Sequence, residues 1–294
     1  MRTIRDIIVV RTVAEMHQIV ADARASGATV GCIPTMGYLH DGHASLIRAA
    51  SKKHRLVVVS IFVNPTQFGP SEDFERYPRN LDHDLKVVAE AGGAVVFAPT
   101  VEEMYPDGAR STIHIPQISE ILEGASRPTH FDGVATVVSR LFEAMHPDEA
   151  FFGQKDLQQT LVIEHMVSAS EIDDVRNVTV TVLPTQREHN GLARSSRNVY
   201  LTAEDREDAT AIYRALTGAS EKMADGENSR ANIEAAMRRT LDSVSGLTVD
   251  YAVAVEASTL QTKDLFISGE QVALLIAVRL GRTRLIDNMV VKMP

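Results

Sequence analysis

The first 185 residues alternate between two hydrophobic patterns. Short continuous apolar runs, rich in Val and Ile, indicate strands that are buried on both faces of a parallel sheet. Stretches with apolar residues at helical spacing, begun by capping residues or ended by glycine, indicate helices. The predicted strands are 28–34, 55–64, 94–100, 149–154 and 177–185, and the predicted helices are 12–26, 44–53, 80–93, 131–146 and 155–169. This alternation predicts an α/β domain with a doubly wound (Rossmann-like), mostly parallel sheet.

The pattern changes after Pro184. A polar loop at 187–198 leads into two helical stretches, and three apolar strands follow them. The helical stretches are 202–224 and 229–246, and the strands are 247–257, 271–281 and 283–291. Helices followed by strands are typical of an α+β arrangement with an antiparallel sheet. We therefore expect a first domain at 1–184 and a smaller α+β C-terminal domain at 185–294.

Composition and charge narrow the choice of partners. The chain has 294 residues, a formal net charge of −9 and a pI near 5.6. A nucleic-acid-binding surface would normally make the chain basic, so nucleic acid is not an expected partner. The sequence shows no secretory segment and no run of 18 apolar residues, which predicts a cytoplasmic protein without a membrane partner. Cys32 is the single cysteine, and its place in an apolar run predicts a buried core thiol.

The stretch TMGYLHDGH, residues 35–43, follows what we predict to be the first strand of the sheet. In open α/β sheets, ligands bind outside the carboxyl ends of the strands. His40 and His43 would share one face of a helix's first turn, where unpaired N–H groups and the helix dipole favour phosphate. Gly42 is expected to let a ligand approach the backbone. The alternative is an ordinary turn with two exposed histidines.

A second strand end carries two amide side chains. Asn64 and Gln67 follow the predicted strand at 55–64 and could hold a hydroxyl or a carboxylate without fixing charge. The alternative is a simple turn, because Asn-Pro is a common turn signal.

A third strand end is FFGQKDLQQ, residues 151–159. Gly153 ends the strand, Lys155 and Asp156 open the next helix, and Gln159 lies one turn further on. A lysine at a helix N-terminus opposes the helix dipole by a few tenths of a kcal/mol up to about 1 kcal/mol, which suggests an anionic ligand. The alternative is a solvated Lys155 paired with Asp156.

A fourth candidate is the glycine-led loop GLARSSRN, residues 191–198. Its serine and arginine side chains form a flexible set of donors that could close over phosphates and exclude water. By composition alone the loop is better explained as an interdomain linker.

Two further charged clusters lie near predicted helix starts. Arg127 and His130 immediately precede the helix at 131–146. Asp82 and Asp84 lie near the start of the helix at 80–93, where helix capping is favoured over a metal site.

Five segments, in this order, resemble the pantothenate synthetase (pantoate–β-alanine ligase) family. They are PTMGYLHDGH, VSIFVNPTQFGPSEDFERYPR, RPTHFDGVATVV, FFGQKDLQQ and REHNGLARSSRN. The first is also a variant of the H-x-G-H signature of the wider nucleotidyltransferase superfamily. The resemblance implies that pantoate attacks ATP, with help from Mg²⁺, to give pantoyl adenylate and pyrophosphate. β-Alanine then attacks the adenylate and releases AMP and pantothenate. It also implies a homodimer, and the C-terminal domain would close over the site.

The resemblance implies roles for individual residues. The implied catalytic residues, which contact phosphates, are His40, His43, Lys155, Ser195, Ser196 and Arg197. The implied ATP site comprises Pro34, Thr35, Met36, Gly37, His43, Gly153, Lys155, Asp156, Ser195, Ser196 and Arg197. The implied pantoate site comprises Met36, Asn64, Gln67 and Gln159, and Asp84 is a candidate near the metal.

Some features depart from the family pattern. Tyr38 and Arg194 stand where a small residue and an apolar residue are common, and residues 168–177 read as a surface insertion. One alternative function is a different adenylyltransferase of the superfamily, such as one that makes a dinucleotide cofactor. Another is a non-catalytic nucleotide-binding protein that retains the fold.

Overall fold

The computed structural model describes residues 7–294 apart from residue 71, and the chain forms two compact units. Unit 1 comprises Met1–Gly153 and Gln158–Pro184, and unit 2 comprises Gln154–Leu157 and Thr185–Pro294. Residues 1–6, on which the absence of a secretory segment partly rests, lie outside the described residues. So does Ser71 of the second strand-end segment.

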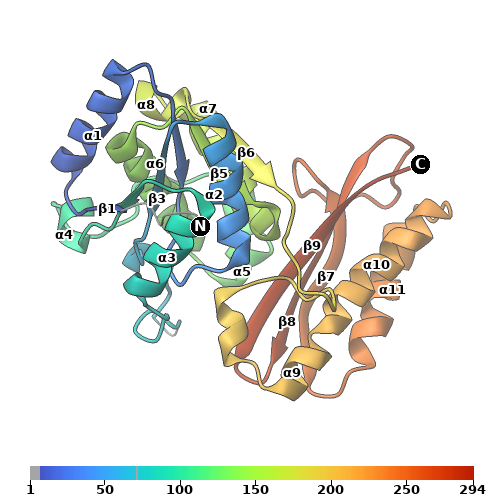
Figure 1. Cartoon of the computed structure of the whole chain (residues 1–294). Coiled ribbons are helices and arrows are strands. Elements are labelled where there is room, and N and C mark those ends of the chain that lie inside the picture. The colour runs from blue at the N-terminus through green and yellow to red at the C-terminus, as the bar shows by residue number, and fades with distance from the viewer. Residues whose placement is uncertain (1–6, 71) are drawn as a thin grey trace. The chain divides into compact units, whose positions relative to one another are not determined.

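Unit 1 is built on a six-stranded parallel sheet (Figure 1). Its strands are β1 (Ile8–Val10), β2 (Val30–Ile33), β3 (Leu56–Ser60), β4 (Val95–Phe97), β5 (Glu149–Gly153) and β6 (Thr179–Leu183). Their order is β1-β4-β3-β2-β5-β6, and every pair is parallel. The predicted Rossmann-like sheet is therefore confirmed.

One prediction about this sheet is wrong. The strand at Val30–Ile33 is the second strand, because Ile8–Val10 pairs with β4 at the edge of the sheet. β1 has only three residues, and the side chains of Ile8 and Val9 are 54% and 37% exposed. Such a short, half-exposed edge strand lacks the long apolar run that marks the central strands.

The helices of unit 1 connect these strands. They are α1 (Val13–Ala25), α2 (Asp41–Lys53), α3 (Leu81–Ala91), α4 (Val101–Met104), α5 (Glu123–Ser126), α6 (His130–Met145), α7 (Leu157–Ala169) and α8 (Asp173–Arg176). The short 3₁₀ turns of unit 1 are η1 (Pro65–Gln67) and η2 (Ile118–Glu120), whereas η3 (Gln154–Asp156) belongs to unit 2. Local chemistry sets the ends of the long helices. Thr12 forms a capping box with Glu15 at the start of α1, and Gly92, at φ +97°, ends α3.

Both faces of the sheet are covered. On one face, side chains of the four central strands pack with α2 and α3 in a single apolar core. Residues that alternate with them, such as Cys32, Val58 and Phe97, point the other way and are also buried. The prediction of a core thiol at Cys32 is confirmed, and burial raises the pKa of that thiol.

The order of the strands fixes where a ligand site is expected. From β2 the chain moves outward through β3 to β4, and β5 then returns to the other side of β2. The topological switch point therefore lies between β2 and β5, and ligands of such folds bind outside the carboxyl ends of strands at this point. The loop after β2 and Gly153, the last residue of β5, flank it.

Unit 2 is an α+β unit. Its antiparallel sheet contains β7 (Leu247–Glu256), β8 (Gln271–Leu280) and β9 (Thr283–Lys292), with β8 in the middle. One sheet face shares a core with the helices α10 (Thr210–Ala224) and α11 (Arg230–Asp242). The stretch predicted as one helix at 202–224 is two, because α9 (Ala203–Asp208) precedes α10, and η4 (Ser196–Tyr200) precedes both.

Among the residues that the structure describes, no helix is long and apolar enough to cross a membrane.

Candidate active site

Thr35 holds the loop after β2 against the end of β3. Its Oγ1 donates to the carbonyl of Ser60 at 2.6 Å and accepts the N–H of Gly37 at 3.1 Å. Its backbone N–H donates to Ser60 Oγ at 3.1 Å. Because both functions of the Thr35 hydroxyl have protein partners, this side chain shapes the candidate ATP loop.

His40 and His43 form a reciprocal pair at the start of α2. His40 Nδ1 accepts the N–H of Gly42 at 3.1 Å, and His43 Nδ1 accepts the N–H of His40 at 3.3 Å. The two ring centroids are 4.1 Å apart. A backbone N–H can only donate, so neither Nδ1 carries a hydrogen and each neutral ring carries its hydrogen on Nε2. The pair therefore provides two Nε2–H donors on adjacent rings, which suits anionic oxygen.

Two details differ from the sequence prediction. His40 is the extended N-cap residue of α2 and not part of its first turn. A Cβ at Gly42 would lie 2.7 Å from His40 Cε1 and 2.8 Å from His40 Nδ1. The absence of a side chain at Gly42 therefore makes room for the His40 ring, whereas the sequence predicts that it makes room for a ligand.

Asp84 of α3 anchors the loop that leads to His40. Its carboxylate accepts the N–H groups of Tyr38 at 2.9 Å and of Leu39 at 2.6 Å, and the neighbouring His83 Nε2 donates to the carbonyl of Leu39 at 3.0 Å. Asp84 is only 1% exposed, and burial raises the pKa of its carboxyl, against the two N–H donors that lower it. The capping interpretation of Asp84 is wrong, because the side chain of Asn80 caps α3.

The anchored loop contains an unusual turn. Gly37 and Tyr38 both have positive φ, +84° and +51°, a conformation that L residues rarely adopt. The hydrogen bond from Tyr38 N to Asp84 helps to hold this turn. A side chain at Gly37 would meet Ile61 at 2.9 Å and Asp84 at 3.0 Å, so only glycine fits there.

The described residues offer no metal site of their own. They contain no group of three or more His, Cys, Asp and Glu side chains placed to hold a metal ion. Both oxygens of Asp84, the candidate ligand, accept backbone N–H groups, so the carboxylate holds the loop before His40. We therefore derive no step through a protein-bound metal.

Asn64, Gln67 and Met36 lie together at the carboxyl ends of β2 and β3. Asn64 Nδ2 donates to Gln67 Oε1 at 3.2 Å and to the carbonyl of Gly133 at 3.1 Å, and Gln67 Nε2 donates to Met36 Sδ at 3.1 Å. Asn64 is 1% exposed. Since its amide donates twice within the protein, Asn64 is placed to position Gln67.

A partly buried ionic network supports the backbone of Gln67. Arg127 forms two hydrogen bonds of 2.7 Å with the Glu72 carboxylate and donates to His130 Nε2 at 3.1 Å. His130 Nδ1 donates to the carbonyl of Gln67 at 2.8 Å. Burial, followed by the positive charge of Arg127, lowers the pKa of His130 to about 4, so its ring is neutral at pH 7. Arg127 and His130, singled out by sequence, thus act on the loop that carries Gln67.

The two neighbouring glutamines of α7 differ. Gln158 is buried, and its amide donates to the carbonyls of Ile118 at 2.7 Å and Ile121 at 2.8 Å and accepts the N–H of Glu123 at 3.1 Å. Gln159 is half-buried and stays the candidate for pantoate.

In unit 2, the turn η3 presents Lys155 and Asp156 before α7 begins. Lys155 Nζ lies 3.6 Å from Asp156 Oδ1, and the Lys155 side chain is 19% exposed. Asn288 of β9 donates to the carbonyls of Gln154 and Lys155, both at 2.8 Å. The pairing of Lys155 with Asp156 that sequence left open is therefore present, and the backbone beneath Lys155 is fixed by β9.

The loop with two serines is tied down at several points. Ser195 Oγ accepts the N–H of Arg197 at 3.3 Å and caps η4, and the N–H of Arg194 donates to the carbonyl of Gln186 at 2.9 Å. Ser195, Ser196 and Arg197 are half-buried. This part of the loop is folded onto unit 2, unlike an extended linker.

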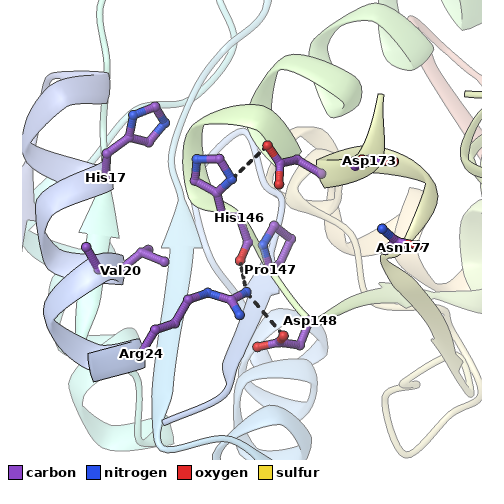
Figure 2. Close-up of a pocket in the computed structure, with 10 residues that line it drawn as sticks. His17, Val20, Arg24, His146, Pro147, Asp148, Asp173 and Asn177 are labelled. Atoms are coloured by element: carbon purple, nitrogen blue, oxygen red, sulfur yellow. Dashed lines mark hydrogen bonds and ion pairs between the residues drawn. The ribbon is translucent and has the colours of Figure 1, made fainter. Parts of the chain in front are cut away.

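A cavity of about 660 Å³ lies at the opposite, amino-terminal edge of the unit 1 sheet (Figure 2). Its charged wall residues pair with one another. Arg24 donates to Asp148 at 3.1 Å and to the carbonyl of His146 at 2.8 Å, and His146 Nδ1 lies 3.2 Å from Asp174. These pairs brace α1, α6 and α8, so we place the candidate site at the carboxyl edge instead.

Sequence reasoning missed several residues that support the site. Tyr105 donates to Asn64 Oδ1 at 2.7 Å, Gly133 lies under η1, and Glu72 and His83 hold other members in place. Tyr105 and Gly133 lie outside the strand-end loops that point to a site in the sequence. No local pattern marks them.

Comparison with known proteins gives one family. The chain matches the family described as "Pantoate-beta-alanine ligase" over residues 8–290. It is 48% identical over 282 residues to the pantothenate synthetase of Moorella thermoacetica, covering 96% of this chain and 98% of that protein. The pantothenate synthetase of Geobacter sulfurreducens is 45% identical with the same coverage.

Solved structures agree. The crystal structure of pantothenate synthetase from Thermus thermophilus has a TM-score of 0.87 at 43% identity, covering 96% of this chain and 99% of that one. A pantoate-β-alanine ligase from Francisella tularensis, described as complexed with β-γ ATP and β-alanine, has a TM-score of 0.76 at 33% identity. That match covers 97% of this chain and 98% of the other.

Proposed function

The chain belongs to the pantoate-β-alanine ligase family, and from this premise we propose how its residues share the work of the reaction. The protein is an ATP-dependent ligase that condenses pantoate with β-alanine to form pantothenate. The relatives' shared name and near-complete coverage leave no support for a dinucleotide-forming adenylyltransferase or a non-catalytic binding protein.

We propose that the reaction runs through an acyl adenylate. A carboxylate oxygen of pantoate attacks the α-phosphorus of ATP, and the bond to the bridging oxygen of pyrophosphate breaks. The neutral amine of β-alanine then attacks the acyl carbon, AMP leaves, and the nitrogen loses a proton to give the amide. Neither step needs a covalent enzyme intermediate, so catalysis depends on positioning and electrostatics.

The histidine pair is the observation that carries this proposal. With both Nδ1 atoms accepting backbone N–H groups, His40 and His43 direct Nε2–H donors toward the phosphates. These donors stabilise the negative charge that shifts onto pyrophosphate as its bond breaks. The backbone that positions them is fixed by Asp84, which keeps the donors preorganised.

We assign the remaining phosphate and nucleotide contacts by family. Lys155, Ser195, Ser196 and Arg197 contact the phosphates, which suits a cation on a fixed turn and hydroxyl donors in a folded loop. The nucleotide contacts, in the same proposal, are Pro34, Thr35, Met36, Gly37, Gly153 and Asp156. Gln67 and Gln159 hold pantoate, with Met36 against its apolar part, and Asn64 positions Gln67.

Three further features belong to the proposal. Mg²⁺ would enter as the counter-ion of ATP and would neutralise phosphate charge, while Asp84 holds the loop before His40. Assembly as a homodimer and a cytoplasmic location follow from the family resemblance and the sequence alone.

Exchange of labelled pyrophosphate into ATP tests the adenylate. We expect exchange that requires pantoate but not β-alanine, because the first half-reaction is complete before the amine binds. A nucleoside monophosphate in place of pantoate should support none. Exchange that appears only when β-alanine is present would exclude a free adenylate.

A further inference from the structure

The side-chain amide of Gln67, which we assign to pantoate, has a fixed orientation. Hydrogen bonds from neighbouring residues set that orientation. We propose that Asn64 and Tyr105 are positioning residues that hold Gln67 as a pure hydrogen-bond donor. Gln67 then selects an acceptor oxygen of the substrate, a carboxylate or hydroxyl oxygen. This inference rests on the proposed function, which makes Gln67 a pantoate contact.

Two backbone groups fix the orientation of Asn64. The N–H of Thr66 can only donate, so the Asn64 atom 3.3 Å from it is Oδ1. The carbonyl of Gly133 can only accept, so the Asn64 atom 3.1 Å from it is Nδ2. The two assignments agree, and they do not depend on the identity of any other side-chain atom.

The orientation of Gln67 follows from that of Asn64. Asn64 Nδ2 donates, so the Gln67 atom 3.2 Å away is the acceptor Oε1. Gln67 Nε2 therefore lies on the other side, 3.1 Å from Met36 Sδ. A turned amide would set the NH₂ groups of Gln67 and Asn64 against each other in a buried place, where an unmade hydrogen bond is costly.

Tyr105 completes the arrangement from α4's end. Its hydroxyl donates to Asn64 Oδ1 at 2.7 Å, the shortest contact that this amide makes. Tyr105 is 3% exposed, and the Arg140 guanidinium lies 5.1 Å from its ring centroid. Gly133 packs closely against η1, the turn that contains Thr66, because a Cβ at Gly133 would lie 2.4 Å from the carbonyl oxygen of Thr66.

The chemistry of the substrate group follows. Thioether sulfur is a weak acceptor, so the contact between Gln67 Nε2 and Met36 Sδ is easily exchanged for a stronger one. A carboxylate or hydroxyl oxygen of the substrate provides it. A group that can only donate would leave the Gln67 N–H with no acceptor stronger than Met36 Sδ, and the site discriminates against it.

A double-mutant cycle tests this. Tyr105→Phe removes one donor to Asn64 and should raise the KM for pantoate about 3- to 10-fold, with the KM for ATP unchanged. In a Gln67→Ala background, the same substitution should change the pantoate KM by less than about twofold, because the group it orients is gone. An equal effect in both backgrounds would show that Tyr105 does not act through Gln67 and would overturn the proposal.

A second variant keeps the test independent of Tyr105. In Asn64→Asp the neighbour of Gln67 only accepts and loses the hydrogen bond to the carbonyl of Gly133, and Gln67 satisfies it by turning Nε2 inward and presenting Oε1 to the substrate. The pantoate KM should rise about 10- to 100-fold while the ATP KM stays constant, with folding checked by the thermal midpoint. Equal losses for both substrates would overturn the proposal.

The control is Tyr213→Phe, which removes a tyrosine hydroxyl in unit 2, where the ring stacks on Arg187, and should leave both KM values unchanged. A wild-type protein without pantoate-dependent turnover would overturn the proposed function and this inference together. A normal wild type with an additive cycle would overturn this inference alone.

Discussion

Gly42→Ala separates the effect of the start of α2 on the position of the His40 ring from its effect on the stability of the protein. The substitution adds one methyl group beside the His40 ring, with the Cβ 2.7 Å from Cε1 and 2.8 Å from Nδ1. An ordinary carbon–carbon contact is about 3.5 Å, so the ring has to move by roughly 0.8 Å. That displacement also breaks or stretches the 3.1 Å hydrogen bond from Gly42 N to Nδ1, which sets both the position and the tautomer of His40.

The folded protein should become no less stable, although its activity falls. Gly42 lies in the first turn of α2 and does not have a positive φ, so alanine fits its backbone. Replacing such a glycine by alanine stabilises a protein by about 0.4–1 kcal/mol, chiefly by restricting the unfolded chain. A misplacement of about 1 Å in a catalytic group can cost about 100-fold in rate. We therefore expect kcat for pyrophosphate exchange to fall about 10- to 100-fold in a protein whose thermal midpoint is unchanged or higher.

The assay is pantoate-dependent pyrophosphate exchange at saturating substrates, run beside thermal unfolding of the same samples. Gly218→Ala is the matched control, because Gly218 is in the helix α10 and, apart from the adjacent residues and the helix's own backbone, no described atom lies within 4 Å of its would-be Cβ. It should gain similar stability and keep full activity. If Gly42→Ala exchanged pyrophosphate at the wild-type rate, the His40 ring would not be a positioned donor, and our interpretation of the histidine pair would fail.

Two further predictions concern α6. Gly133→Ala should lower the unfolding free energy in urea by about 1–3 kcal/mol and raise the pantoate KM. The added methyl would lie 2.4 Å from a backbone oxygen of η1, which therefore has to move. An unchanged pantoate KM would contradict the coupling of α6 to Gln67. The second concerns His130, whose pKa is about 4 in the folded protein against an ordinary value of 6.5. The unfolded chain therefore takes up a proton first as the pH falls. The stability from the neutral ring is complete above pH 6.5 and is lost as the pH falls toward 4. Between pH 7 and pH 4 the wild type should therefore lose about 3 kcal/mol more unfolding free energy than His130→Asn, and parallel pH profiles would contradict the depressed pKa.

The sequence predicts most strands and helices of this protein well because short local patterns determine them. The apolar run of β3 and the Thr12 and Asn80 caps of α1 and α3 act over a few residues, so their spacing is visible along the chain. The loops with His40 and Gln67 could be found because they follow such strands. The edge strand β1 was missed since it has three residues, of which only Val10 is buried, and so carries too little of this signal.

The supporting contacts of the site could not be predicted in the same way. Asp84 binds the N–H of a residue 46 positions away, Tyr105 binds Asn64 across 41 positions, and Asn64 binds Gly133 across 69. Capping was a reasonable explanation for an aspartate near a helix start. It failed because the carboxylate points to another loop, and only the fold decides that direction.

Neighbouring amides in this protein show why residue type alone does not assign a role. Gln158 and Gln159 are adjacent, yet the first is buried with three protein hydrogen bonds and the second is half-buried on the next position of α7. Asn64 and Gln67 are both buried, but Asn64 donates both its hydrogens to oxygen atoms of the protein, whereas Gln67 donates to the weak acceptor Met36 Sδ. An amide whose hydrogen-bonding capacity is already used inside a buried network would have to break it to bind a substrate, and the desolvation penalty of the partners left behind opposes that. Such a residue affects the reaction only through the neighbour it orients. Satisfaction of donors and acceptors, which depends on the folded backbone, therefore distinguishes the residues that hold the substrate from those that hold the site.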